Sequence, residues 1–408
     1  MCLITKLLKA FLLNKDKIML NKIISTWPSF THEEADAVSN VILSNKVNYW
    51  TGTEGREFED EFAQWIGCKY AVALANGTVA LDLAFKALGV GEGDEVIVSS
   101  RTFLASVTSI VNTGAVPVFA EVSLDSQNIT PESVREKISA KTKAIVCVHL
   151  AGWPCEMDGM MALADEFGLF VIEDCAQAHG AKYKGKPVGS IGHIGTWSFC
   201  QDKIMTTGGE GGMVTTHNHD LWSRIWSYKD HGKSWNSVYE KEHPAGFRWL
   251  HNSFGTNGRM TEMQAVIGRI QLKRMADWTS SRQANANRIW EVSKECMGLR
   301  VPSVPDYIEH AVYKCYVFVE PDELNSDWNR GRIMSEINTL GVLCFSGTCS
   351  EVYLEKAFDD TDFRPEERLP NAKELGETSL VFLVHPTLTE DEMKQTCDVI
   401  KKVMELAT

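Results

Sequence analysis

Lys203 is the side chain in this sequence best suited to covalent chemistry. It follows the apolar run 196–199 and precedes residues 206–212, four of which are glycine. A lysine amine forms an imine with an aldehyde when the backbone brings it unprotonated to the carbonyl carbon. Most lysines lie on the surface in water, but a strand-like run and a flexible turn flank this one. We therefore interpret Lys203 as a cofactor-binding lysine, with the hydroxyl of Ser198 near a phosphate.

Asp174 is the second chemical candidate, because it ends the apolar run 169–173. A carboxylate at this place has two interpretations. It can cap the helix that follows, or it can hold a protonated pyridine nitrogen and so keep a pyridine ring electron-withdrawing. In the second case Gln177, one helical turn further on, would lie near the ring hydroxyl.

Asn76, Gly77 and Thr78 lie between the apolar run 70–75 and the helical pattern 79–88. Glycine lets the backbone approach a ligand closely, and the unpaired N–H groups at a helix start can bind a phosphate. An ordinary helix cap explains the same three residues. His149 also has two interpretations, because it could face a cofactor or be a buried, hydrogen-bonded histidine.

The elements that must position these residues alternate between short apolar runs and helical stretches. Strands are expected at residues 70–75, 95–99, 116–122, 144–150, 169–173, 196–199 and 213–216. Continuously apolar runs separated by helix-length segments are typical of buried parallel strands. The pattern predicts an α/β fold with a mostly parallel sheet sandwiched by helices. Ligands of such sheets bind beyond the carboxyl ends of the strands, where the candidate residues fall.

The remaining chain suggests two lobes, as a length of 408 residues does. We expect an N-terminal extension at 1–26, a large lobe at 27–275 and a smaller α+β lobe at 276–408. The tryptophan-rich stretch 217–258 is expected to form long loops and short helices over the site or at a subunit contact. A helix is expected from about residue 261 to 278.

Composition excludes several classes of protein. The formal net charge of -13 disfavours nucleic acid as a partner, and no apolar run is long enough to span a membrane. The eleven cysteines contain no CxxC pair, so neither a disulfide framework nor a metal site is expected, and a cytoplasmic location fits best. Lysines interrupt the apolar start of the chain, which argues against a signal peptide.

Five ordered motifs together resemble the DegT/StrS-type sugar aminotransferases, which are fold-type I enzymes that depend on pyridoxal 5'-phosphate (PLP). The likeness runs from about residue 27 to the C-terminus. The segments that carry it are 76–78, 102–103, 173–180, 198–212 and 255–265. Residues 50–52 and 385–386 also resemble the family but are less diagnostic.

The resemblance implies a role for each matching residue. Lys203 would hold PLP as an imine and move protons, and Asp174 would pair with the pyridine nitrogen. Phe103 would stack on the ring and Gln177 would contact its hydroxyl. The phosphate would be held by Gly77, Thr78 and Ser198, and also by an asparagine of the partner subunit that matches Asn257. A homodimer with shared sites follows.

Two departures from the family pattern bear on these expectations. An additional glycine at Gly208–Gly209 shifts the turn after the lysine but should leave Lys203 in place. Arg101 occupies a position that the family often gives to serine or an aromatic residue, and either substrate or local packing could explain it.

Three rival functions fit the sequence less well. Related sugar 3-dehydratases carry histidine where this chain has Lys203. A non-catalytic homologue would not need the intact set of Asp174, Gln177, Ser198 and Lys203. A phosphate-binding oxidoreductase is disfavoured because no GxGxxG turn follows any early strand of this chain.

The expected reaction transfers an amino group from L-glutamate to a nucleotide-linked keto-sugar. Residues 345–351 look most like those of enzymes that aminate C4 of a 4-keto-6-deoxy sugar on UDP or GDP. The favoured substrate is UDP-4-keto-6-deoxy-N-acetylglucosamine, on the way to bacillosamine-type surface glycans such as O-antigen. GDP-perosamine formation and C3 amination of a dTDP-sugar stay open.

Overall fold

A seven-stranded sheet forms the centre of the computed structural model, which describes residues 24–408. The strand order is β1-β9-β8-β5-β4-β2-β3. Strands β8, β5, β4, β2 and β3 are parallel, whereas β9 runs antiparallel to both β1 and β8. The bounds are β1 (Tyr70–Leu74), β2 (Glu95–Ser99), β3 (Val116–Ala120), β4 (Thr142–Val148), β5 (Phe170–Asp174), β8 (Ile194–Ser198) and β9 (Gly212–Thr216).

The predicted α/β architecture is confirmed, and each predicted strand is present within about two residues of its expected ends. The sheet is apolar on both faces because helices cover both. Along β1, Val72 and Leu74 pack into one core, whereas Ala71 and Ala73 pack into a second core on the opposite face. Successive strand residues point to opposite faces, so a strand between two cores has no polar alternation.

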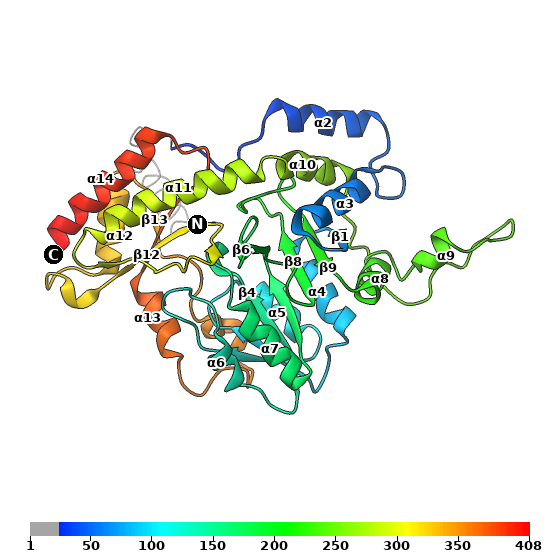
Figure 1. Ribbon diagram of the computed structural model, residues 1–408, viewed down its shortest axis with the longest axis horizontal. Coiled ribbons are helices and arrows are strands. Elements are labelled where there is room, and N and C mark those ends of the chain that lie inside the picture. Colours follow the sequence, from blue (N-terminus) through cyan, green and yellow to red (C-terminus); the bar gives the residue numbers. More distant parts are fainter. Residues whose placement is uncertain (1–23) are drawn as a thin grey trace, which may run out of the picture.

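Different helices cover the two faces of the seven-stranded sheet. The first core is built with α4 (Gly77–Leu88), α5 (Ala105–Val111), α7 (Met157–Phe167) and α8 (His219–Tyr228). The second is built with α3 (Glu54–Ile66) and α10 (Glu262–Leu272), and α2 (His32–Leu43) lies outside α10 (Figure 1). A short α6 (Pro131–Arg135) and the small sheet of β6 (Lys182–Tyr183), β7 (Lys186–Pro187) and β11 (Ile308–Glu309) complete this part.

The C-terminal part has its own antiparallel sheet and its own core. The sheet order is β10-β12-β14-β13, with bounds β10 (Leu299–Arg300), β12 (Cys315–Val319), β14 (Ser379–Phe382) and β13 (Cys344–Phe345). Its core also contains residues of α11 (Met275–Lys294), α12 (Arg330–Thr339) and α14 (Glu390–Ala407), while α13 (Pro370–Thr378) faces the large sheet's core. We propose that the boundary between the two lobes lies at the start of α11, near the expected residue 275.

The single helix predicted for residues 261–278 is wrong, because the chain forms α10 and α11 with a break at Lys273 and Arg274. The guanidinium group of Arg274 binds Glu34 at 2.7 Å and Glu33 at 2.6 Å, both on α2. Helical periodicity continues through the break, so the sequence pattern contains no trace of this tertiary contact. The extension predicted for residues 1–26 lies outside the described residues, except for 24–26.

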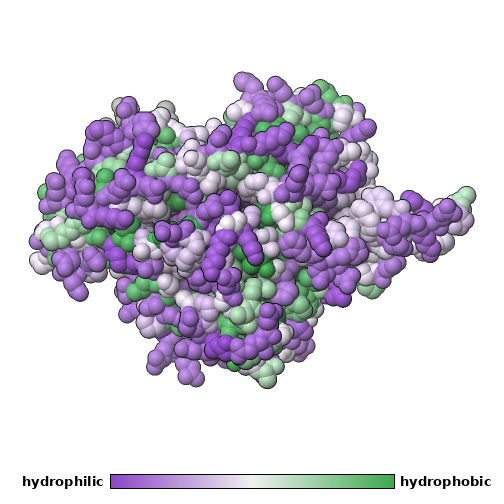
Figure 2. Space-filling view, in the orientation of Figure 1, coloured by the Kyte–Doolittle hydropathy of each residue, from purple (hydrophilic) through white to green (hydrophobic). Residues whose placement is uncertain are grey.

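The tryptophan-rich stretch forms α8 and then a long projecting segment, residues 230–257, which we call the arm. The arm contains the short helix α9 (Trp235–Tyr239). Its two limbs meet in bridges between Asp230 and Asn257 and between Lys233 and His251. The arm projects from the body of the molecule beside α8 (Figures 1 and 2). Four large rings of the arm are exposed, namely Tyr239, Phe247, Trp249 and Phe254. No helix between residues 24 and 408 combines the length and apolar character needed to cross a membrane.

Candidate active site

A cavity of about 860 Å³ lies at the carboxyl ends of the parallel strands. The large lobe contributes the start of α4 and the residues that end or follow β2, β5 and β8, and the small lobe contributes residues on and beside β12 and β13. Seven of the eight residues predicted to serve the cofactor line this one cavity: Gly77, Thr78, Phe103, Asp174, Gln177, Ser198 and Lys203. Residues far apart in the chain thus meet at one place.

Lys203 extends into the cavity from the loop after β8. Its side chain is only 17% exposed, and its Nζ lies 3.7 Å from Oδ1 of Asp202 and 5.4 Å from the ring centre of Tyr313. The backbone is also held, because the indole N–H of Trp27 donates to the carbonyl oxygen of Lys203 at 2.8 Å. The amine is therefore presented from a fixed backbone into a partly enclosed space.

Asp174 is the last residue of β5 and its carboxylate is oriented by two donors. The hydroxyl of Ser106 donates to Oδ2 at 2.8 Å, and the backbone N–H of Ala176 donates to Oδ1 at 3.1 Å. Ser106 also exchanges a hydrogen bond with Thr102 at 2.9 Å. No helix directly follows Asp174, so the predicted helix cap is wrong. The carboxylate instead stabilises the turn at Ala176 and Gln177, and the same carboxylate lines the cavity.

The start of α4 provides a place for an anion. Asn76 caps the helix by accepting a hydrogen bond from the N–H of Val79 at 2.9 Å. A Cβ atom on Gly77 would lie 2.6 Å from Cβ of Ser198, so only glycine lets the helix start approach the end of β8. The helix N-terminus and the hydroxyls of Thr78 and Ser198 form a donor set suited to phosphate.

Two further side chains suit a flat heteroaromatic ring. Phe103 is 69% exposed although it is a large apolar residue and lines the cavity, which is the state expected of a ring that stacks on a ligand. Gln177 accepts a hydrogen bond from the N–H of Ala151 at 2.8 Å through Oε1, which fixes the side chain and leaves its NH₂ group as a donor.

The donor set fits PLP at every part of that molecule. Lys203 would offer an amine to the aldehyde, Asp174 a carboxylate to the ring nitrogen, and Phe103 a ring for stacking. The start of α4 can receive the phosphate. The fold and this cavity together define a PLP-dependent enzyme of the aminotransferase class.

Comparisons with known proteins identify the family. Residues 28–401 match the DegT/DnrJ/EryC1/StrS aminotransferase family, and the chain belongs to it. It is a PLP-dependent nucleotide-sugar aminotransferase of that family. Among solved structures, an aminotransferase from Psychrobacter cryohalolentis is 64% identical with a TM-score of 0.93, over 94% of this chain and 99% of that one. DesV of S. venezuelae is 30% identical with a TM-score of 0.82, over 92% and 95% of the two chains.

Curated relatives differ in the nucleotide and in the sugar that their names give. The GDP-perosamine synthase of Escherichia coli O157:H7 is 42% identical over 66% of this chain and 72% of its own length. The UDP-N-acetyl-3-dehydro-alpha-D-glucosamine 3-aminotransferase of Acidithiobacillus ferrooxidans is 34% identical over 89% of this chain and 92% of its own. The comparisons therefore give the class of substrate without selecting one sugar.

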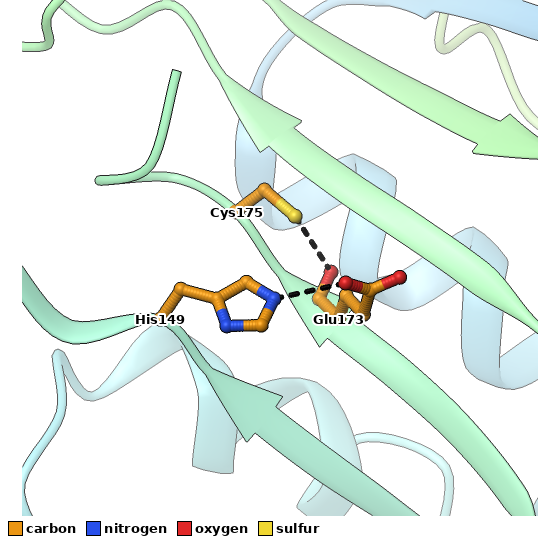
Figure 3. A group of neighbouring side chains, drawn as sticks. All are labelled: His149, Glu173 and Cys175. Atoms are coloured by element: carbon orange, nitrogen blue, oxygen red, sulfur yellow. Dashed lines mark hydrogen bonds and ion pairs between the residues drawn. The ribbon is translucent and has the colours of Figure 1, made fainter. Parts of the chain in front are cut away.

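His149, Glu173 and Cys175 form a buried cluster beside the cavity whose candidate ligand atoms lie within 4.8 Å of one another (Figure 3). His149 Nε2 lies 3.0 Å from Glu173 Oε2, and its Nδ1 accepts from the N–H of Cys155 at 3.0 Å. Burial opposes ionisation of Glu173, but His149 and the N–H groups of Gly189 and Gly192 hold its pKa below the usual value. Burial raises the pKa of the Cys175 thiol well above its ordinary value. The cluster is a hydrogen-bonded part of the core, and His149 is the buried, satisfied histidine of the two interpretations.

Four other predicted features lie outside the cavity. Asn257 is exposed at the base of the arm and is not among the cavity residues of its own chain. Arg101 is fully buried, with hydrogen bonds to Gln127 at 3.0 Å and Ser379 at 2.9 Å, so its role is packing between the lobes. Trp50 stacks on Tyr239 of α9, and His385 stacks on Trp27.

Sequence reasoning missed several residues of the site. Ser106 orients Asp174, Trp27 holds the backbone of Lys203, and Tyr313, Lys314 and Tyr316 form the wall from the small lobe. The spacing of Thr102 and Ser106 would place both on one side of a helix start, but a pair of small hydroxyl residues is too common to stand out. The wall residues come from a strand about 110 residues beyond Lys203, and only the packing of the two lobes brings them there.

Proposed function

We propose that the protein transfers the amino group of L-glutamate to C4 of UDP-4-keto-6-deoxy-N-acetylglucosamine. Bound PLP supplies an aldehyde that accepts the amino group and a pyridine ring that withdraws electrons. Lys203 attaches the cofactor and then moves the proton between the donor carbon and the cofactor, because its amine, once released from the cofactor, is a base beside the reacting carbon. Asp174 supports both steps by keeping a negative charge against the ring nitrogen.

The wall that the small lobe contributes to the cavity supports a 6-deoxy sugar as the substrate. Tyr316, Phe345, Gly347 and Thr348 of the small lobe line the same cavity as Lys203. These residues supply two rings, a glycine and two hydroxyls, and the hydroxyl of Tyr316 already accepts from the N–H of Thr348 at 3.0 Å. Such a wall suits the apolar 6-methyl face of a deoxy sugar better than a fully hydroxylated one. The resemblance of residues 345–351 to enzymes that aminate C4 of a 4-keto-6-deoxy sugar on UDP or GDP supports amination at C4.

GDP-4-keto-6-deoxymannose, the precursor of GDP-perosamine, is the second candidate. The 42% identity to the GDP-perosamine synthases of Escherichia coli O157:H7 and Vibrio cholerae favours it. A relative from Aneurinibacillus thermoaerophilus is named dTDP-3-amino-3,6-dideoxy-alpha-D-galactopyranose transaminase and is 32% identical, so amination at C3 belongs in the same test. A relative named for spore coat polysaccharide biosynthesis supports a role in surface glycans.

The protein acts, in this proposal, as a cytoplasmic homodimer in which Asn257 of each chain completes the phosphate site of the other. The exposure of Asn257 outside its own cavity supports this arrangement, as do the exposed rings of Phe247, Trp249 and Phe254 on the arm. Large exposed rings that cluster on a projecting segment mark an association surface. The ten cysteines between residues 68 and 397 are free thiols, which suits a reducing compartment.

The substrate assignment is tested by incubating the PLP-loaded protein with L-glutamate and three keto-sugars linked to UDP, GDP and dTDP. Mass spectrometry of each product shows whether oxygen has been replaced by an amino group, and NMR locates the carbon. We expect the highest kcat/KM with the UDP-sugar and amination at C4. A higher kcat/KM with the GDP-sugar would transfer the assignment to perosamine formation, and amination at C3 would contradict both.

A further inference from the structure

Positive charge exceeds negative charge at the end of the cavity where Lys203 lies. Lys203 and Arg282 both act electrostatically on Lys314, and Asp202 is the acid among the groups that perturb it. Asp202 is already engaged, since it lies 3.7 Å from Lys203 and accepts a hydrogen bond from the hydroxyl of Tyr313. Asp174 and Glu210 also line the cavity. Among the groups that act on Lys314, however, one carboxylate stands against two further cations, an imbalance that an anionic ligand would relieve.

Lys314 is the cation of this group that is available to a ligand. It lies directly before β12, is half-buried and lines the cavity. Its ammonium group is 4.9 Å from the ring centre of Tyr313, and the ammonium group of Lys203 is 5.4 Å from the same centre. Lys314 forms no ion pair with any residue from 24 to 408. Burial lowers its pKa, and Arg282 and Lys203 lower it further, so a bound anion would stabilise its charge.

Arg282 lies behind this wall and adds a fixed charge. Its side chain is buried, its Nη1 donates weakly to the carbonyl oxygen of Tyr313 at 3.4 Å, and Nε and Nη2 have no hydrogen-bond partner among the described residues. Burial lowers its pKa to about 9, so it is still charged at neutral pH. A buried arginine without a carboxylate partner is unusual, because a desolvated charge is costly unless it is paired.

We propose that Lys314, with the field of Arg282 behind it, binds the carboxylate next to the reacting carbon of the amino donor. This inference rests on the proposed function. The carboxylate of an amino acid is bonded directly to the carbon that loses its proton, so it must lie near the amine of Lys203. The diphosphate of a nucleotide-sugar is separated from the reacting sugar carbon by most of a pyranose ring. Of these two anions, the carboxylate is the one that reaches the neighbour of Lys203.

The experiment measures binding of glutarate, a dicarboxylate without an amino group, to the PLP-loaded protein by calorimetry. We expect Lys314→Gln to weaken glutarate binding about tenfold, as for the loss of one charge-assisted contact, and Lys314→Arg to restore part of it. Lys402→Gln, which removes an exposed charge on α14, should leave binding unchanged. Thermal unfolding of Lys314→Gln should show no loss of Tm, because the variant relieves repulsion between like charges.

Two further ligands test whether Lys314 binds a different anion from the donor carboxylate. UDP reports the diphosphate site, and titration of the cofactor-free protein with PLP reports the phosphate site. Unchanged glutarate binding in Lys314→Gln, or a loss of UDP or PLP affinity as large as that for glutarate, would overturn the proposal. Bleaching of the cofactor band by L-glutamate on the same samples tests the proposed function separately, since glutarate binds without reacting.

Discussion

The carboxylate of Asp174 makes local hydrogen bonds and also lines the cavity, so we propose that it serves the fold and the reaction together. Its Oδ1 accepts from the N–H of Ala176 and its Oδ2 from Ser106, yet it faces the cavity. Its residue type and its position at the end of an apolar run were enough to predict from sequence that it belongs to the site. Its hydrogen-bond partner Ser106 was not predicted as a site residue, because a serine near the start of a helix has many ordinary roles. Residues that do chemistry are thus easier to predict than the residues that orient them.

Asp174→Asn separates the two roles of that side chain. An amide still accepts from the N–H of Ala176, and the rotatable hydroxyl of Ser106 can then accept rather than donate, so we expect little change in Tm. The charge that opposes the ring nitrogen is lost, and kcat should fall about a hundredfold or more. Steady-state kinetics and thermal unfolding of the same preparations check this expectation. A large loss of Tm with intact kcat would assign Asp174 to the fold alone.

Gly77→Ala tests the close approach of α4 to β8. A Cβ atom would lie 2.6 Å from Cβ and 3.1 Å from Cα of Ser198, so the helix start must move away from the phosphate position. We expect the dissociation constant for PLP, measured by absorbance titration of the cofactor-free protein, to rise about tenfold. Gly91→Ala is the matched control, because its Cβ would meet only the carbonyl oxygen of Thr113 at 3.8 Å. Equal affinity in the two variants would contradict the phosphate site.

At the scale of elements, the strands were predictable and the breaks between helices were not. Continuous apolar runs identify strands such as β2 and β4 because both faces of the sheet are buried. The break between α10 and α11 depends on Arg274 binding α2, which is distant in the chain. The antiparallel direction of β9 is also invisible in its composition. Local patterns report burial and periodicity, whereas direction and breaks depend on partners that are distant in sequence.

Lys229 links three of the elements that position the start of α4. It is fully buried at the end of α8, and its Nζ lies 2.6 Å from Oε1 of Glu59 on α3, which also accepts from the N–H of Ala73 on β1. Lys229→Met would leave the Glu59 carboxylate buried without its cation, and we expect a loss of about 3–5 kcal/mol in the free energy of unfolding. Denaturant unfolding measures it. The double variant Lys229→Met with Glu59→Gln should be more stable than the single one, and a single-variant loss near zero would refute a structural ion pair.

At the scale of the whole molecule, the site needs both lobes of one chain, and the proposal adds the arm of a second chain. The sequence indicated two lobes but not which small-lobe residues would reach the cavity. Tyr313, Lys314 and Tyr316 lie on or beside a strand of the second sheet and meet Lys203 only through the packing of the lobes. The position of Asn257 outside its own cavity agrees with a site completed across a dimer, and sequence suggested that only through the family likeness.

Mixing two inactive variants tests the shared site. Lys203→Ala lacks the amine, and Asn257→Ala lacks the residue proposed to cross the interface, so each homodimer should be impaired. After the mixed chains are dissociated and reassociated, half of the dimers pair one of each, and one of their two sites then has both residues. Activity should recover to roughly a quarter of the wild-type value. Recovery would not occur if Asn257 served its own chain, and unmixed variants treated identically are the control.

The central claim, that Lys203 attaches PLP and moves its proton, is tested most directly by visible absorbance spectra of purified wild type and Lys203→Ala before and after L-glutamate. The wild type should show the yellow band of lysine-bound PLP, and glutamate should bleach it as the amino group moves to the cofactor. The variant should lack that band and fail to complete the half-reaction. A wild-type protein without a cofactor band after added PLP, or a variant that converts glutamate at the wild-type rate, would contradict the account.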